Sequence, residues 1–219
     1  MHSTLKSVNK IFLGGSYSYY ISKDRNFFIK VCKGKGKWIT KEFFYLKKYW
    51  NKLGIDNLQL IEPINYSEAK EFLITKFVDS KKLVDILNPK IYYIFGKKLK
   101  IFHEKGFSHS HLEVHDILYN NGKFILADVP FFNEREQIHD LVSIKLSLNI
   151  YKLKRPWYWY KYKICSKEFF NGYALYNSKE LEKEYEISIK KRIRLYLRRD
   201  IIYKIKAYLL KLIHKSRLL

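Results

Sequence analysis

The chain has 219 residues, of which 47% are apolar, and its 43 Lys and Arg residues outnumber 21 Asp and Glu residues to give a net charge of +22. This apolar content excludes a wholly disordered chain, and only 9 Gly and 4 Pro residues exclude collagen-like and low-complexity proteins. No run of about 18 uncharged apolar residues is present to span a bilayer, and the first residues lack the apolar core of a signal peptide. We therefore expect a cytoplasmic protein. Its two cysteines, Cys32 and Cys165, are too few for a disulfide framework or a cysteine zinc site.

The excess of cations favours a polyanionic partner, such as nucleic acid, anionic lipid or a phosphorylated glycan. Lys, Ile, Asn and Tyr are all abundant, so an AT-rich genome could account for much of the total. Such a bias does not explain where along the chain the cations lie.

The first third of the chain is predicted to be rich in β-strands. Polar or Gly-containing turns separate apolar runs that suit strands, at residues 10–13, 17–21, 27–32, 61–66 and 71–77. One segment in this region, residues 39–53, has apolar residues at helical spacing, and Gly54 is expected to end that helix.

From about Asp79 the pattern becomes mainly helical. Residues 91–104 are predicted to form a helix, and residues 117–127 a β-hairpin around the Asn-Asn-Gly-Lys turn. The sequence therefore predicts an α+β chain in two lobes. The first, residues 1–78, is a small antiparallel β lobe with one helix, and the second, residues 79–219, is a larger helical lobe.

Two features of the first lobe suit a nucleotide. Gly14, Gly15 and Ser16 form a turn between two strands, where backbone N–H groups could cover phosphates, although a plain hairpin has the same sequence. Lys30 lies inside an apolar strand, where an unpaired ammonium is costly. Glu42, at the start of the next helix, could pair with it; alternatively, Lys30 faces solvent on an edge strand.

Two further features follow later in the chain. Residues 71–79 are an apolar strand that leads into a polar segment, as in a hinge between lobes and in many strand ends. Asp116 precedes the hairpin, and Asp128 stands at the end of its second strand. Two carboxylates in this arrangement are a candidate magnesium pair.

With these residues in this order, the sequence resembles the protein-kinase-like fold, and most of all the compact bacterial branch that includes the lipopolysaccharide core heptose and Kdo kinases. The family pattern is roughly H-G-D-x-H-x-x-N-I-L, a short hairpin, and then D-F or D-hydrophobic. Here residues 109–129 read H-S-H-L-E-V-H-D-I-L-Y-N-N-G-K-F-I-L-A-D-V. The resemblance covers about residues 10–150, and it depends on order and spacing rather than on one motif.

The resemblance implies a role for each matching residue. Lys30 matches the lysine that contacts the nucleotide phosphates, and Glu42 matches its partner on the helix. Asp128 matches the metal-binding aspartate after the hairpin, and Asp116 falls where a metal-binding asparagine usually stands. Asp140 resembles the aspartate that anchors the catalytic loop from the following helix.

Three departures from the pattern bear on activity. His111 replaces the catalytic-base aspartate, Asp116 replaces the asparagine, and no Gly follows Asp128 and Val129. Mg²⁺ accepts a carboxylate in place of an amide oxygen. A neutral histidine, whose reference pKa is about 6.5, can accept a hydroxyl proton near pH 7. The same substitution is also expected in a chain that binds nucleotide without transferring phosphate.

A zinc hydrolase is a rival interpretation of the same loop. His109, His111, Glu113, His115 and Asp116 nearly match an H-x-H-x-D-H cluster, but the final histidine comes one position too late.

The C-terminal part of the chain is basic and aromatic. Residues 155–163 mix five aromatic residues with Arg and Lys, which suits a sugar, a membrane interface, single-stranded nucleic acid, or a loop that closes the helical lobe. Residues 190–219 hold eleven Lys and Arg and one acid. Amphipathic helices there would attract an anionic membrane by about 1 kcal/mol per cation near the lipid, or would form a final core helix with a solvated basic face.

The function expected from these observations is ATP- and Mg²⁺-dependent phosphorylation of a sugar hydroxyl on a lipopolysaccharide core or related glycolipid. The expected partners are thus a glycolipid or phosphorylated glycan and the anionic inner face of the membrane, where the protein would be peripheral. One alternative is a catalytically inactive kinase-like protein that binds nucleotide as a scaffold. Another is a basic nucleic-acid-binding module, which we do not expect because Lys30, Glu42, Asp116 and Asp128 follow the kinase order.

Overall fold

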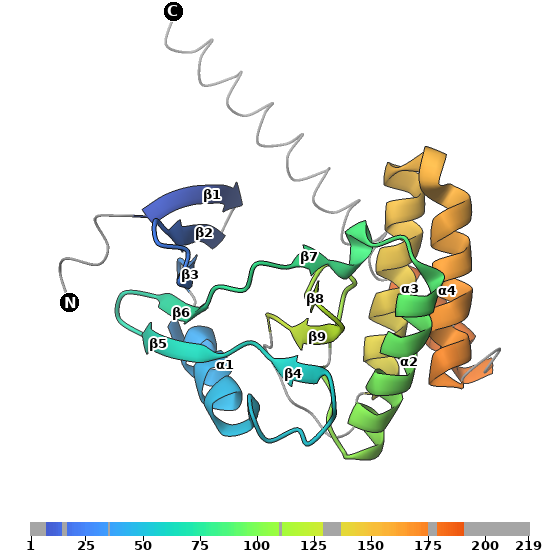
Figure 1. The fold of residues 1–219 in the computed structure, drawn as a ribbon, viewed down its shortest axis with the longest axis horizontal. Coiled ribbons are helices and arrows are strands. Elements are labelled where there is room, and N and C mark those ends of the chain that lie inside the picture. The colour runs from blue at the N-terminus through green and yellow to red at the C-terminus, as the bar shows by residue number, and fades with distance from the viewer. Residues whose placement is uncertain are drawn as a thin grey trace, which may run out of the picture. The chain divides into compact units, whose positions relative to one another are not determined.

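The computed structural model describes residues 8–14, 17–34, 36–109, 111–128, 137–174 and 179–190 (Figure 1). The chain forms two compact units, residues 1–176 and residues 177–219. The first unit holds all the described strands and the helices α1 to α4, and in the second unit residues 179–190 are helical. None of the helices in the described ranges combines the length and the hydropathy that a bilayer crossing requires.

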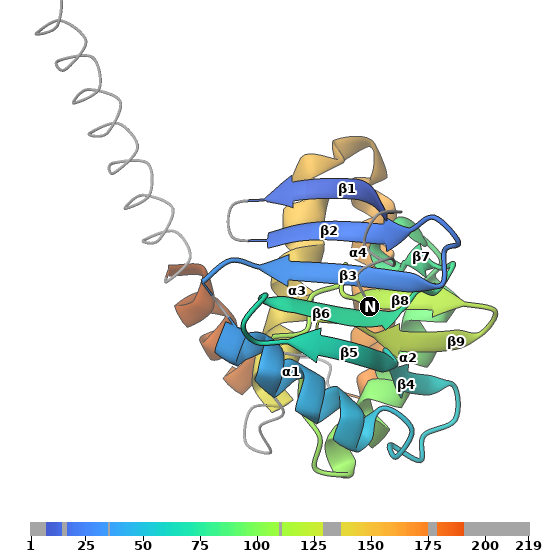
Figure 2. The same cartoon turned by 90° about the vertical axis from the view of Figure 1, so that its left-hand side faces the viewer.

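A five-stranded antiparallel sheet forms the first part of the fold, with the spatial order β1-β2-β3-β6-β5 (Figure 2). Its strands are β1 (Val8–Gly14), β2 (Tyr17–Ser22), β3 (Phe27–Cys32), β5 (Pro63–Ser67) and β6 (Phe72–Lys76). These bounds agree with the predicted runs to within one or two residues. Because β3 is the middle strand, it has hydrogen-bonded neighbours on both sides.

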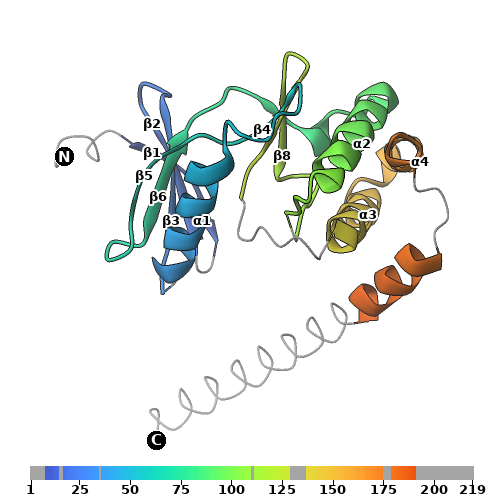
Figure 3. The same cartoon turned by 90° about the horizontal axis from the view of Figure 1, so that it is seen from below.

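Helix α1 (Gly36–Tyr49) packs along one face of this sheet, against β5 and β6 (Figure 3). Its buried apolar side chains, Ile39, Phe43 and Leu46, follow the helical period, and Phe43 stacks on Tyr66 of β5 with ring centroids 4.4 Å apart. The helix begins three residues before the predicted start and ends four before the predicted end. The prediction of residues 39–53 was therefore wrong at its C-terminal end, where residues 50–52 form turns instead.

A second, smaller sheet has the order β4-β9-β8-β7. The expected hairpin is present as β8 (Ile117–Asn120) and β9 (Lys123–Leu126), joined by Asn121 and Gly122, which both have positive φ angles of 45° and 84°. Two edge strands escaped prediction because they are too short to show a pattern, namely β4 (Leu58–Leu60), parallel to β9, and β7 (Lys81–Lys82).

Three helices pack beside this sheet, α2 (Pro89–Glu104), α3 (Gln137–Lys154) and α4 (Trp159–Tyr173), with short 3-10 turns at η2 (Leu83–Asp85) and η3 (Pro156–Tyr158) (Figure 1). Strands followed by helices confirm the predicted α+β class. The boundary expected near residue 78 stays a prediction.

Helices α2 and α4 approach each other so closely that each needs a glycine at the contact. A Cβ atom on Gly96 would lie 2.2 Å from the carbonyl oxygen of Phe169, and one on Gly172 would lie 2.0 Å from that of Tyr93. Real Cβ contacts are longer than this, so the two backbones could not keep their present distance if either residue were larger.

We expect Gly96→Ala to destabilise the fold by about 2–3 kcal/mol, because the added methyl group forces α2 and α4 apart. The free energy of unfolding in urea measures this loss. Lys97→Ala, at an exposed neighbouring position of α2, is the matched control and should change stability by less than about 0.5 kcal/mol. Equal stability of the two variants would contradict the close helix contact.

Candidate active site

Lys30 lies at the centre of the candidate site. It stands in the middle strand β3, opposite Tyr19 of β2 and Leu73 of β6, and only 8% of the residue is exposed. Its Nζ donates a hydrogen bond of 2.9 Å to Oε2 of Glu42 on α1, and it also contacts Oδ1 of Asp128. The expected ion pair with Glu42 is thus present, and the alternative of a solvent-facing lysine on an edge strand is wrong.

The charges in this cluster stabilise one another. Burial alone would lower the pKa of Lys30, but the carboxylates of Glu42 and Asp128 more than offset it and hold that pKa well above its ordinary value. Burial alone would likewise raise the pKa of Asp128, and the Lys30 ammonium reverses this and lowers it. Lys30 is therefore cationic and Asp128 anionic at neutral pH.

Asp128 is held in an uncommon backbone conformation. Its φ angle of 55° lies in the left-handed region, which Asp and Asn adopt more readily than other residues with a Cβ atom. It follows Ala127, the first residue after β9, whose N–H donates 2.9 Å to the carbonyl oxygen of Asp116. Its side chain is 46% exposed, so one part faces Lys30 while another remains accessible.

Asp116 is the second carboxylate expected to bind metal, and its surroundings differ from those of Asp128. Burial, the negative charge of Asp128 and that of Glu113 together raise the pKa of Asp116 to about 8. The two aspartates are thus close enough to repel each other, which is the arrangement that a divalent cation relieves. Carboxylate oxygens are the ligands that Mg²⁺ prefers, so the residues present fit that ion.

Asp140, at the start of α3, holds the loop that carries His111. The fully buried carboxylate accepts hydrogen bonds from the backbone N–H groups of His109 at 2.7 Å and Leu112 at 3.2 Å, and from the Ser108 hydroxyl at 3.3 Å. The structure therefore confirms the expected anchoring contact. Because an unpaired buried carboxylate would be costly, these bonds fix the loop against α3.

His109 fastens the same loop to the end of β9. Burial lowers the pKa of His109, so the imidazole is neutral and its Nε2–H donates 3.1 Å to the carbonyl oxygen of Ala127. This nitrogen cannot serve as a metal ligand while it donates that bond. Among the described residues, no group of three or more His, Cys, Asp or Glu could hold a metal ion. The structure thus gives the zinc hydrolase interpretation no support.

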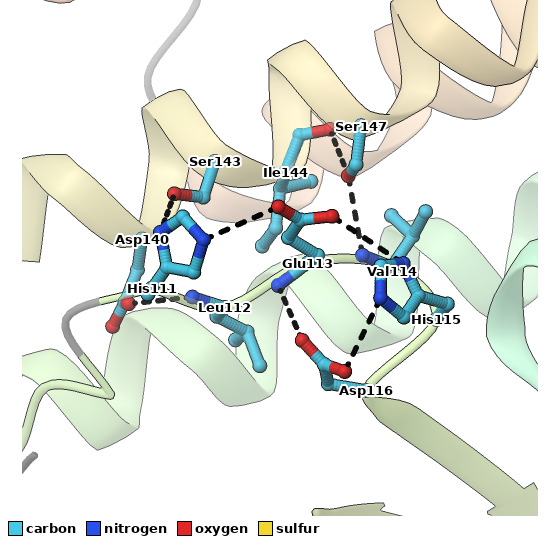
Figure 4. A network of polar contacts seen from close by, with 10 residues as sticks. All are labelled: His111, Leu112, Glu113, Val114, His115, Asp116, Asp140, Ser143, Ile144 and Ser147. Carbon is cyan, nitrogen blue, oxygen red and sulfur yellow. Dashed lines mark hydrogen bonds and ion pairs between the residues drawn. The ribbon is translucent and has the colours of Figure 1, made fainter. Parts of the chain in front are cut away.

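His111 projects into solvent from the loop, with 58% of its side chain exposed. Figure 4 shows Glu113 between the rings of His111 and His115: one carboxylate oxygen lies 3.3 Å from His111 Nε2, and the other lies 3.4 Å from His115 Nδ1. The Ser143 hydroxyl of α3 is 3.4 Å from the remaining nitrogen of His111, and His115 Nε2 is 3.5 Å from Asp116. One chain of polar contacts therefore joins His111 to Asp116.

Sequence reasoning missed the position of Glu113, which it considered only as a zinc ligand. No local signal placed it there, because residues 113–116 form a turn, in which the Asp116 N–H donates 2.9 Å to the carbonyl oxygen of Glu113. This turn, and not the alternation of an extended strand, sets the position of His115 relative to Glu113. The roles of His111, Asp116, Asp128, Lys30 and Glu42 stay predictions.

The turn expected to cover the nucleotide can be placed only in part. Gly14 ends β1. Gly15, Ser16 and the segment from Val129 to Pro130 lie outside the described residues.

With this geometry in hand, comparisons with known proteins identify the fold. No protein-family model and no curated protein matches the sequence. Among solved structures, the ternary complex of APH(2″)-IIa with streptomycin and ATP matches with a TM-score of 0.59 at 10% identity, over 85% of this chain and 84% of that one. Amicoumacin kinase hAmiN, in complex with AMP-PNP, Ca²⁺ and Ami, matches with a TM-score of 0.57 at 11% identity, over 79% and 73% of the two chains.

A choline/ethanolamine kinase family protein from Mesorhizobium loti also matches, with a TM-score of 0.56 at 8% identity, over 81% of this chain and 72% of that one. The chain thus has a bilobal protein-kinase-like fold, as the resemblance implied. These similarities do not support the narrower resemblance to lipopolysaccharide core kinases, which stays a prediction.

We expect Asp116→Asn to stabilise the chain in EDTA at pH 7.5 by about 1–3 kcal/mol. Folding raises the pKa of Asp116 from 3.8 to about 8, so between these values the folded chain binds a proton that the unfolded chain has released. The contribution of Asp116 to stability therefore falls as pH rises from about 4 to about 8. Thermal unfolding measured across this range should show that the melting temperature of the variant, relative to that of the wild type, increases with pH. A difference that is independent of pH would contradict the raised pKa.

Proposed function

We propose that the chain is an ATP- and Mg²⁺-dependent phosphotransferase with a hydroxyl group as acceptor. One observation carries the proposal: buried Lys30 pairs with Glu42 and also reaches Asp128, beside Asp116. A lysine held by a helix glutamate, next to a metal-binding aspartate, is the arrangement that kinases use on nucleotide phosphates. The fold supports the same function, since structures with this fold contain ATP or AMP-PNP.

In this function each residue of the cluster has a physical task. Lys30 is cationic and buried, so it offers an attractive site for phosphate oxygens when nucleotide enters. Glu42, which is itself 5% exposed, keeps the Lys30 ammonium in place on the strand. Asp116 and Asp128 would hold Mg²⁺, which when bound supplies neutralisation of charge on the phosphates. Lys30 would then exchange its contact with Asp128 for a phosphate oxygen.

His111 would take the proton of the acceptor hydroxyl. Since Glu113 accepts from Nε2–H, the nitrogen left to take up a proton is Nδ1, on the side of Ser143. The Glu113 carboxylate then faces the imidazolium that forms and stabilises it. Glu113 thus acts as a positioning residue for His111, while Asp140 fixes the loop that carries both.

Within this class, we propose a sugar hydroxyl on a lipopolysaccharide core or another glycolipid as the acceptor, met at the inner face of the membrane. The support is the net charge of +22, which favours an acceptor that carries phosphate or carboxylate groups, together with the sequence resemblance.

A specific observation also favours the alternative of a nucleotide-binding scaffold. Both ring nitrogens of His111 lie within 3.4 Å of protein oxygens, those of Glu113 and Ser143. A hydroxyl acceptor must displace or share one of these contacts before His111 can act as a base. In a nucleotide-binding scaffold, the site would bind nucleotide, and His111 would keep its contacts with Glu113 and Ser143.

We expect Asp128→Asn and Lys30→Met each to weaken Mg²⁺-dependent ATP binding by about tenfold or more, because each removes a charged contact with the metal or the phosphates. Calorimetric titration with and without Mg²⁺ measures this loss. Lys76→Met, on the adjacent strand β6, replaces an exposed lysine that pairs with Glu62 and is the matched control. If both site variants bound ATP as the wild type does, the nucleotide site would lie elsewhere.

We expect His111→Ala to lower turnover about 10²–10⁴-fold, the usual loss for a general base, with little change in ATP affinity. Glu113→Gln should lower turnover less, and His139→Ala, at an exposed position of α3, should have no effect. Transfer of γ-phosphate is measured to purified core glycolipid and, in parallel, to an aminoglycoside and to choline.

The acceptor panel and one further variant distinguish the candidates. Transfer to the core glycolipid alone would support the narrower proposal, and transfer to another acceptor would correct the substrate class. A wild type that binds ATP but never transfers phosphate, together with a His111→Asp variant that does, would establish the scaffold instead.

A further inference from the structure

A cluster of exposed aromatic and aliphatic side chains stands at the end of the α3–α4 hairpin, which lies at the upper right of Figure 1. The exposed fractions are 83% for Leu153, 77% for Trp157, 67% for Tyr160, 48% for Trp159 and 40% for Tyr158. We call these five residues the aromatic tip. Large apolar side chains gathered on a surface mark a site that another molecule covers.

Cations flank the tip in the sequence. Between residues 141 and 167 the sequence has seven Lys and Arg and no Asp or Glu. Lys161 lies over the ring of Tyr158 and Lys163 over that of Trp159, at 5.8 and 5.3 Å from the ring centroids. The ammonium groups of these lysines lie over two of the rings, whereas Trp157 and Tyr160 are more exposed.

We propose that the aromatic tip docks the protein onto an anionic membrane surface. Trp and Tyr beside Lys and Arg are the residues that collect at the bilayer interface, where the rings enter the headgroup level and the cations reach the phosphates. Each cation near an anionic bilayer strengthens binding by about fivefold. Leu153 favours lipid over nucleic acid, because an aliphatic side chain has no ring to stack on a base.

Two other occupants fit the charge less well. Residues 190–219 of the chain carry eleven Lys and Arg and one acid, so a basic surface repels them. A second copy of the chain, with a net charge of +22, would be repelled for the same reason.

Tyr151, two residues before Leu153 of the tip, connects the end of α3 with the loop of the candidate active site, within the same compact unit. The ring of Tyr151 lies 6.4 Å from His115 on one side and 6.3 Å from Tyr162 on the other. Arg155 stacks on Tyr151 at 5.5 Å and pairs with Asp85 at 2.9 Å, which fixes the turn between α3 and α4. Docking would therefore turn the end of α3 that carries Tyr151, the ring partner of His115, toward the lipid surface. The inference does not rest on phosphotransfer, because a nucleotide-binding scaffold could dock in the same way.

Tryptophan fluorescence of the full chain tests which surface enters the membrane. The chain has four tryptophans, Trp38, Trp50, Trp157 and Trp159. In the double variant Trp38→Phe with Trp50→Phe, the remaining tryptophan fluorescence comes only from the tip. In the double variant Trp157→Phe with Trp159→Phe, it comes only from the first lobe. Vesicles of equal parts phosphatidylglycerol and brominated phosphatidylcholine should shift the tip emission to shorter wavelength and quench it, and leave the first-lobe reporter unchanged.

Affinity provides the second measurement. Trp157→Ser with Tyr160→Ser should weaken co-sedimentation with anionic vesicles by about tenfold or more, since two large rings lose their burial. The matched control, Trp38→Ser with Phe44→Ser, removes two exposed rings of α1 (48% and 56% exposed) and should bind as the wild type does. Binding should weaken as salt is added, because the attraction to lipid phosphates is screened.

Four results would overturn the proposal. One is the absence of vesicle binding, and another is binding without quenching of the tip, which would assign it to another segment such as residues 190–219. Equal quenching of both reporters would mean insertion without a defined surface. Quenching of the tip by single-stranded RNA, at concentrations where anionic vesicles have no effect, would assign the tip to nucleic acid. Phosphotransfer could persist in each case, so these failures are distinguishable from failure of the proposed function.

Discussion

The rest of the structure depends on the cost of burying the Lys30 ammonium. A lysine in the middle strand of a sheet is tolerated only if carboxylates meet it there. Glu42 comes from the helix that covers the sheet, and Asp128 comes from a segment 98 residues further along the chain. The ion pairs therefore require that α1 lies on this face and that the end of β9 reaches the five-stranded sheet. Removal of Lys30 would leave Glu42 buried without this charge.

The same pairing makes two aspartates behave differently. Asp128 faces the ammonium, which lowers its pKa, whereas burial and the neighbouring carboxylates raise the pKa of Asp116 to about 8. Because only Asp128 has a cationic partner in Lys30, a bound divalent cation would relieve the repulsion at Asp116. The loop that carries Asp116 cannot relax away from the repulsion, because Asp140 and His109 fasten its other end to α3 and β9.

The features that could be predicted are those set by residues close to one another in the sequence. The pairing of Lys30 with Glu42 spans a strand and the next helix, and the hairpin of β8 and β9 follows from its Asn-Gly turn. The missed strand β4 is three residues long and exists only because β9, more than sixty residues later, pairs with it in parallel. The C-terminal end of α1 and the position of Glu113 between two imidazoles likewise depend on packing, which the local pattern does not contain.

The distribution of charge argues that the acidic site is specific. A biased genome can raise the number of lysines everywhere, and the net charge of +22 fits such a bias. It cannot gather acids at one place. Five of the 21 acidic residues belong to the site: Glu42 and Asp128 contact Lys30, Glu113 and Asp116 lie in the loop before β8, and Asp140 holds that loop from α3. Residues 141–167 hold none. Carboxylates brought together at the cost of mutual repulsion, in a chain otherwise rich in cations, are what a metal-dependent site requires, and the acid-free stretch beside them leaves the aromatic tip open to an anionic surface.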